Sequence, residues 1–203
     1  MLNVATKKTK VEETKFWTRF IDENKIKKLL VRNRGLVYVF TGDGEGKTTA
    51  ALGLGLRAIG HGKNVVVVQF MKGRKYVGEY QAQKLLKNYE VYQFGKEQFV
   101  DLKHPDKEDY ELAKQGLEFA KQVIKKRPDV LILDEINIVV DTGLLKVDDV
   151  LGLINSIPKD MMLILTGRNV NKKIIKVADV VSYVKNIKHI FDYGVFARKS
   201  EQY

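Results

Sequence analysis

The stretch T-G-D-G-E-G-K-T-T, residues 41–49, combines residue types that bind phosphate groups. Glycines let a loop turn tightly and aim its N–H groups at an anion, and a lysine and a hydroxyl add a cation and a ligand for Mg²⁺. The usual phosphate loop is G-x-x-x-x-G-K-[S/T], and Thr41 stands where that pattern has its first glycine. Three other glycines compensate: Gly42, Gly44 and Gly46. We therefore expect Lys47 to reach the terminal phosphates of a nucleotide and Thr48 to ligate Mg²⁺.

The residues on either side of the loop favour this interpretation over a glycine-rich turn with a stray lysine. LVYVF precedes the loop and predicts a strand, and AALGLGLRAIG follows it and predicts a helix. A loop in this setting surrounds an anion with its own amides and with the N-terminus of the helix.

Two acids, Asp134 and Glu135, follow the apolar run VLIL. Carboxylates are hard oxygen ligands that suit Mg²⁺, and an ion held there neutralises a polyphosphate. Acidic residues at the end of a strand are common, so Asp134 and Glu135 indicate a metal site only in combination with the phosphate loop. We expect both side chains on the metal side of the nucleotide.

Two further polar stretches, residues 69–73 and 166–168, follow apolar runs and predict strand ends. Ligands of doubly wound sheets bind outside the carboxyl ends of the strands, so both stretches belong to the functional edge, although each alone resembles an ordinary strand exit. His61 and His189 lack partners at metal-ligand spacing, and we expect them to pack or cap.

Six short apolar runs predict strands that are covered on both faces. They span residues 36–41, 64–70, 90–94, 129–134, 161–166 and 179–184. Helical patterns lie between them, most clearly at residues 47–60, 79–88, 106–126 and 146–156. The alternation predicts the α/β class, with a doubly wound, mainly parallel sheet of the phosphate-loop NTPase (RecA-like) kind.

The chain of 203 residues is long enough for one sizeable domain, expected at residues 35–203. Residues 1–34 predict a basic N-terminal helical arm, because Phe16, Trp17 and Phe20 recur at helical spacing. The arm could dock permanently on its own domain or close over a substrate. With no cysteine, no apolar signal core and no membrane-length apolar run, we expect a cytoplasmic protein without a membrane partner.

The net charge of +11 is concentrated at the two ends of the chain. Residues 1–34 hold ten basic and four acidic side chains, and residues 168–203 hold eight and three. A high pI suggests a nucleic-acid binder, but charge alone favours the alternative, a solvated lysine-rich surface. No helix-turn-helix pattern or aromatic-rich basic groove supports nucleic acid as a partner.

Four motifs occur in order from Thr41 to the C-terminus. They are TGDGEGKTTAALGLGLRAIGHGKNVVVVQFMKG, LILDEIN, LTGR and ADVVSYVKNIKHIFDYGVFARKSEQY. Together they closely resemble the phosphate-loop type of ATP:corrinoid adenosyltransferase. The resemblance covers residues 35–203, and its most specific parts are T-G-x-G-x-G-K-T-T and K-H-x-F-D-x-G-V.

The resemblance implies transfer of the 5′-deoxyadenosyl group of ATP to the Co(I) centre of a corrinoid, with triphosphate as the leaving group. It further implies Mg²⁺ as cofactor, a reductase or reductant that makes Co(I) from Co(II), and a homodimer. Co(I) is a strong nucleophile that needs no base, which agrees with a sequence that has no candidate catalytic triad. The alternatives are a nucleic-acid-binding ATPase and a module that holds ATP and corrinoid without turnover.

The resemblance also assigns residues. The ATP loop comprises Thr41, Gly42, Asp43, Gly44, Glu45, Gly46, Lys47, Thr48 and Thr49. Arg168 is expected to bind the nucleotide, and Arg57 the phosphates unless it is an ordinary exposed helical residue. Four residues are expected to stabilise charge on the departing triphosphate: Lys47, Thr48, Arg57 and Glu135. Three are expected around the metal: Thr48, Asp134 and Glu135.

On the corrinoid side, family members carry G-x-G-F-x-W after the third strand, whereas this chain has FGKEQFV at residues 94–100. The tryptophan is absent. In the family, aromatic side chains around the corrinoid help remove its lower axial ligand. The resemblance implies that Phe99 serves in that place, with plain core filling as the alternative.

Overall fold

The computed structural model describes residues 33–98 and 100–194. The expected arm, apart from Asn33 and Arg34, lies outside the described residues, as do Phe99 and residues 195–203.

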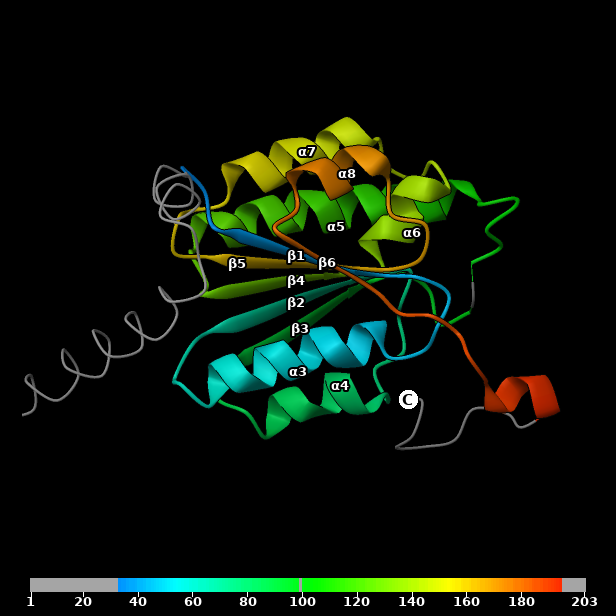
Figure 1. The fold of residues 1–203 in the computed structure, drawn as a ribbon, viewed down its shortest axis with the longest axis horizontal. Coiled ribbons are helices and arrows are strands. Elements are labelled where there is room, and N and C mark those ends of the chain that lie inside the picture. Colours follow the sequence, from blue (N-terminus) through cyan, green and yellow to red (C-terminus); the bar gives the residue numbers. More distant parts are fainter. Residues whose placement is uncertain (1–32, 99, 195–203) are drawn as a thin grey trace, which may run out of the picture. The chain divides into compact units, whose positions relative to one another are not determined.

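Six parallel strands form one sheet in the order β3-β2-β4-β5-β1-β6 (Figure 1). The strands are β1 (Leu36–Thr41), β2 (Val65–Phe70), β3 (Tyr89–Phe94), β4 (Val130–Asp134), β5 (Met162–Thr166) and β6 (Val180–Tyr183). All six predicted strands are confirmed, with ends that agree to within one residue. The order places β5 between the strand that leads into the phosphate loop and the strand that ends at Asp134.

Helices cover both faces of the sheet (Figure 1). On one face lie α3 (Lys47–Ile59) and α4 (Gly78–Gln81). On the other face lie α5 (Lys107–Lys125), α6 (Ile136–Asp141), α7 (Val147–Ser156) and α8 (Lys172–Val177). Two short 3₁₀ helices, η1 (Ala82–Lys84) and η2 (Ile190–Tyr193), complete the described elements. None of the described helices has the length and hydropathy needed to cross a membrane.

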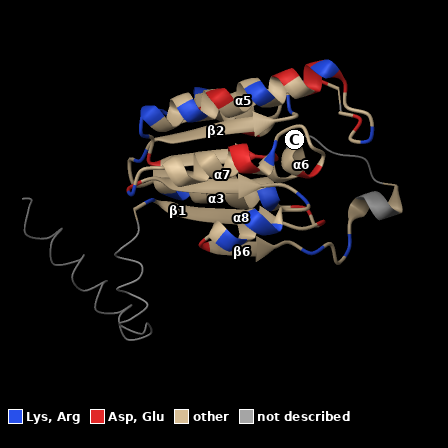
Figure 2. Cartoon of the chain, turned by 90° about the horizontal axis from the view of Figure 1, so that it is seen from above, with Lys and Arg blue, Asp and Glu red and all other residues tan. Residues whose placement is uncertain are grey.

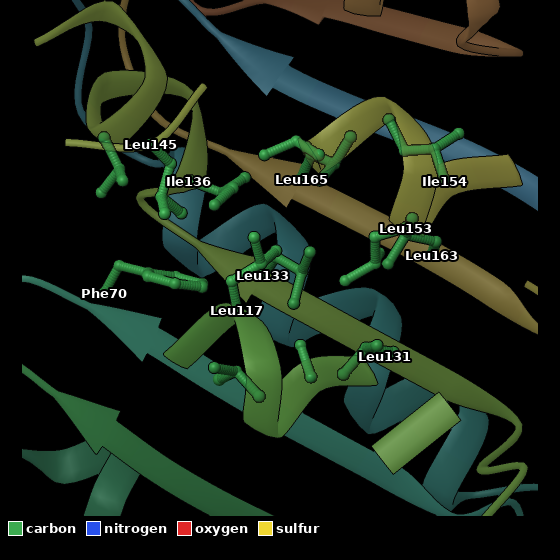
Figure 3. Packing of buried hydrophobic residues seen from close by; sticks show 14 of the residues in the cluster. Phe70, Leu117, Leu131, Leu133, Ile136, Leu145, Leu153, Ile154, Leu163 and Leu165 are labelled. Atoms are coloured by element: carbon green, nitrogen blue, oxygen red, sulfur yellow. The ribbon is translucent and has the colours of Figure 1, made fainter. Parts of the chain in front are cut away.

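The apolar core divides into two layers because side chains alternate between the faces of a strand. In β2, Val66, Val68 and Phe70 belong to the cluster beneath α5, while Val65 and Val67 belong to the cluster beneath α3. Figure 3 shows the first cluster, with leucines of α5, β4 and β5 packed against one another. Because both faces of β2 are buried, its sequence is a continuous apolar run and does not alternate between apolar and polar residues.

The long helix α5 begins where its first turn supplies its own caps. The Asp106 carboxylate accepts from the Asp109 N–H at 3.1 Å, and the Asp109 carboxylate accepts from the Asp106 N–H at 3.0 Å. Lys96 pairs with both acids, at 2.6 and 2.9 Å. The outer face of α5 carries both basic and acidic side chains (Figure 2). This helix therefore presents no surface of a single charge sign.

The helix expected at residues 79–88 is shorter than predicted. It consists of one turn of α4 followed by η1. The Gln83 side chain donates to the Tyr80 carbonyl at 2.9 Å and accepts from the Val91 N–H at 3.3 Å. Because Gln83 occupies a carbonyl that a longer helix would use and ties it to the edge of β3, the chain turns there instead.

Two helical glycines differ in what surrounds them, and this difference predicts opposite effects of alanine. A Cβ at Gly116 in α5 would lie 2.7 Å from the Phe70 ring, whereas a Cβ at Gly152 in α7 would meet nothing within 4 Å. Gly116→Ala should lower the free energy of unfolding by about 1–3 kcal/mol through overpacking. Gly152→Ala, the matched control, should raise it by about 0.5–1 kcal/mol through helix propensity. Urea unfolding measures both, and stabilisation by Gly116→Ala would contradict the close α5–β2 packing.

Candidate active site

The phosphate loop joins β1 to α3 at the carboxyl edge of the sheet (Figure 1). Gly42 and Gly46 have φ values of 109° and 104°, in the region that favours glycine. Gly42 also touches the chain after β6, where an added Cβ would lie 2.3 Å from the Val184 carbonyl oxygen. The glycines of this loop therefore meet two demands, which are backbone conformation and close approach of a second segment.

Thr41, which replaces the first glycine of the usual pattern, is the last residue of β1. Its side chain is buried, and its hydroxyl oxygen accepts a hydrogen bond from the Val170 N–H at 3.3 Å. The Thr41 side chain thus holds the segment after β5 against the end of β1.

Lys47 begins α3 and is 8% exposed. Its ammonium group donates to the Gly44 carbonyl of its own loop at 2.5 Å. Burial lowers the pKa of Lys47, and the negative charge of Glu135 opposes that shift. Within the described part of the chain no side chain caps α3, so the N–H groups of its first turn are available to an anion. A cation beside the amides of an uncapped helix N-terminus suits a phosphate group.

Asp134 ends β4, is fully buried and accepts four hydrogen bonds. Oδ1 accepts from the hydroxyls of Thr48 and Thr166 at 2.8 and 2.7 Å. Oδ2 accepts from Lys72 Nζ and Gln69 Nε2 at 2.8 and 3.1 Å. Burial works to raise the pKa of Asp134, but the charge of Lys72 and these donors hold it below its ordinary value. Asp134 is therefore an ionised carboxylate whose acceptor positions are taken.

Glu135 contrasts with its neighbour, because no donor among the described residues bonds to its half-buried carboxylate. Burial and then the charge of Asp134 raise the pKa of Glu135. Its backbone has φ 66°, an uncommon conformation for a non-glycine residue, and its N–H donates to Thr166 Oγ1 at 2.9 Å. Of the two acids, Glu135 is thus the one open to a cation, while Asp134 orients Thr48.

Lys72 reaches Asp134 because the chain after β2 turns sharply. Met71 has φ 56°, and its N–H donates to the Phe94 carbonyl at 2.9 Å. The β2 and β3 exits touch there, since a Cβ on Gly95 would lie 2.2 Å from the Lys72 nitrogen. The sequence placed residues 69–73 on the functional edge without a role. The missing information was that β2 neighbours β4, with Gln69 opposite Asp134 in the register.

The remaining predicted residues divide into near and distant ones. Arg168 is exposed after β5, close enough for its positive charge to act on both Lys47 and Glu135. Thr49 is exposed in the first turn of α3. Arg57 is exposed in the last turn of α3, about 15 Å along the helix axis from Lys47. The structure does not bring Arg57 to the loop.

A glycine-rich loop after β1, a buried lysine at a helix N-terminus and a carboxylate two strands away define a phosphate-loop nucleotide-binding protein. Residues 33–203 match the family described as ATP:corrinoid adenosyltransferase BtuR/CobO/CobP. The chain therefore belongs to the ATP:corrinoid adenosyltransferase family.

Individual relatives agree with the family match. The chain is 37% identical over 167 residues to the corrinoid adenosyltransferase of Escherichia coli K12, covering 81% of this chain and 84% of the relative. It is 37% identical over 172 residues to corrinoid adenosyltransferase CobA of Salmonella typhimurium, covering 84% and 86%. A corrinoid adenosyltransferase of Sinorhizobium is 34% identical over 177 residues, covering 84% and 81%.

The ion pair between Lys72 and Asp134 predicts a large effect of removing its cation. Lys72→Met leaves a fully buried carboxylate without a countercharge, and the free energy of unfolding at pH 7 should fall by about 2–4 kcal/mol. Lys72→Arg should recover part of the loss, as should Asp134→Asn added to Lys72→Met.

Lys63→Met is the matched control, because Lys63 makes an exposed pair with Asp129 and its loss should change stability far less. Chemical denaturation measures all the variants. Equal effects of Lys63→Met and Lys72→Met would show that Asp134 does not depend on its countercharge.

Proposed function

We propose that this protein transfers the 5′-deoxyadenosyl group of ATP to the Co(I) centre of a corrinoid and releases triphosphate. The observation that carries the proposal is Lys47, buried at the start of α3 beside an uncapped helix N-terminus, in a chain that belongs to the corrinoid adenosyltransferase family. Family membership does not favour the nucleic-acid-binding ATPase, and we do not propose it.

In the proposed reaction the cobalt nucleophile attacks the 5′ carbon of ATP. A cobalt–carbon bond forms, the bond between that carbon and the α-phosphate oxygen breaks, and its electron pair leaves on triphosphate. No proton has to move. The chain's share is therefore to orient ATP and to stabilise the charge that grows on the leaving group.

The charges of the site suit this task. Lys72 neutralises the buried Asp134 through an ion pair of 2.8 Å, and Glu135 carries the remaining charge on this side of the site. Lys47 and Arg168 remain for the triphosphate, together with the loop amides. Because Lys47 is buried and bonded to its own loop, its charge needs little reorganisation when negative charge develops.

The residues present fit one Mg²⁺ ion. Across residues 33–98 and 100–194 there is no group of three or more acidic or histidine side chains that could hold a metal on its own. Mg²⁺ typically binds through one or two protein groups together with substrate phosphates and water. Thr48 and the open carboxylate of Glu135 would hold the ion, with Asp134 orienting the Thr48 hydroxyl. Bound there, Mg²⁺ would neutralise part of the triphosphate charge.

Two further proposals rest on the family resemblance. The first is that a reductase or a chemical reductant supplies Co(I), because the reaction consumes a reduced corrinoid. The second is that the protein works as a homodimer.

Incubation with Mg-ATP and chemically reduced corrinoid tests the function. We expect the spectrum of a cobalt–carbon bond to develop and one triphosphate to appear for each corrinoid adenosylated. Triphosphate is separated from orthophosphate by ion-exchange chromatography. Orthophosphate as the main product, formed without corrinoid, would make the protein an ATPase.

Lys47→Ala tests the phosphate loop itself. Loss of a preorganised charge contact should lower the rate of adenosylation about 10²–10³-fold. The far-ultraviolet circular dichroism should not change, because the glycines that shape the loop remain. Lys63→Ala is the matched control, since Lys63 pairs with Asp129 next to the first residues of β2 and β4, at the opposite edge of the sheet from the loop, and its rate should equal that of the unmodified chain. A Lys47→Ala variant with normal turnover would overturn the loop assignment.

A further inference from the structure

The phosphate loop contains two carboxylates, Asp43 and Glu45, in the segment expected to surround a triphosphate. Both side chains are exposed. The negative charge of Asp43 already acts on Lys47. A loop acid that turned towards Lys47 would compete with phosphate for that cation and would repel the incoming anion.

The chain that leaves β6 lies along this loop in direct backbone contact. The Val184 N–H donates to the Thr41 carbonyl at 2.7 Å, and the Gly44 N–H donates to the Val184 carbonyl at 2.9 Å. A Cβ on Gly44 would lie 2.8 Å from the backbone of Lys185. We call residues 183–189 the loop clamp. The contact sets the position of the clamp because Thr41 and Tyr183 are also paired in the β1–β6 register.

Both loop acids bond to the loop clamp. Asp43 Oδ1 accepts from the Tyr183 hydroxyl at 3.3 Å and from the Asn186 N–H at 3.4 Å. Hydrogen bonds from its own N–H and from that of Asn186 hold the pKa of Asp43 below its ordinary value. Glu45 Oε2 lies 3.0 Å from His189 Nε2. The K-H-x-F-D-x-G-V motif begins inside the clamp, at Lys188, and His189 is its histidine.

We propose that the loop clamp positions the phosphate loop for triphosphate by holding the carboxylates of Asp43 and Glu45 away from Lys47, with His189 as the positioning residue for Glu45. The proposal rests on the proposed function and assigns a role to a motif which that function leaves unused. In this proposal His189 makes no contact with the phosphates. It acts through Glu45, by keeping Lys47 free for the leaving group.

Exposure distinguishes this role from a structural one. The side chains of Glu45 and His189 are 51% and 26% exposed, and an exposed pair of this kind contributes little to the stability of a fold. Loss of the pair should therefore change the affinity for polyphosphate and leave the melting temperature nearly unchanged. A residue that merely supports the fold would do the reverse.

A double-mutant cycle on the full chain tests the proposal, with inorganic tripolyphosphate and ATP as separate calorimetric probes and no corrinoid present. His189→Ala should weaken tripolyphosphate binding about 3- to 10-fold. Glu45→Gln removes the competing charge and should bind at least as tightly as the unmodified chain. The double variant should match Glu45→Gln, because the proposed effect of His189 on tripolyphosphate passes through the charge of Glu45. His189→Gln serves as a second substitution if His189→Ala lowers the melting temperature.

His104→Ala is the control, because His104 also contacts an acidic side chain, Asp101 at 3.5 Å, in a more exposed segment outside the site. Its affinity for both probes should not change. Equal weakening in His189→Ala and in the double variant would show that His189 does not act through Glu45, which overturns the clamp alone. An unmodified chain that binds neither probe would overturn the phosphate site, and with it the proposed function.

Discussion

The buried carboxylate of Asp134 is the constraint on which the functional edge of this protein depends. A charge at zero exposure is tolerated only with partners, and Asp134 has four. They come from the start of α3, the end of β2, the turn after β2 and the end of β5. One side chain therefore connects four segments around the phosphate loop, and Thr48 is one of its four partners.

Backbone strain gathers at the same edge. Three of the four described non-glycine residues with positive φ are Met71, Glu135 and Asn169, which follow β2, β4 and β5. Such conformations persist only where surrounding contacts impose them. Met71 lies where the β2 and β3 exits approach closely, the Glu135 N–H donates to Thr166, and the Asn169 side chain donates to the Asp141 carboxylate at 2.8 Å. The strands that carry the apolar core are regular, so these three uncommon conformations lie in the segments that follow the strands, at the edge that holds the phosphate loop.

The phosphate loop is held by side-chain hydrogen bonds on one side and by backbone contacts on the other. From below, Lys47 and Thr48 belong to α3 and connect to the interior through Asp134. From outside, the loop clamp lies against the loop backbone at Gly42 and Gly44. The absence of side chains at these glycines is what permits that contact. A loop with T-G-x-G in place of the usual first glycine is therefore adapted to a neighbour as well as to a ligand.

Local signals in the sequence determined the six strands, the parallel α/β class and the phosphate loop with Asp134 and Glu135, because periodicity and short motifs depend on neighbouring residues. The predicted length of the helix at residues 79–88 was wrong, because the Gln83 side chain ends that helix through a contact with the next strand. Only the tertiary structure decided that Lys72 pairs with Asp134, that Glu135 is the open acid and that His189 meets Glu45. These contacts join segments up to 144 residues apart, and they depend on strand order and backbone approach, which no local pattern encodes.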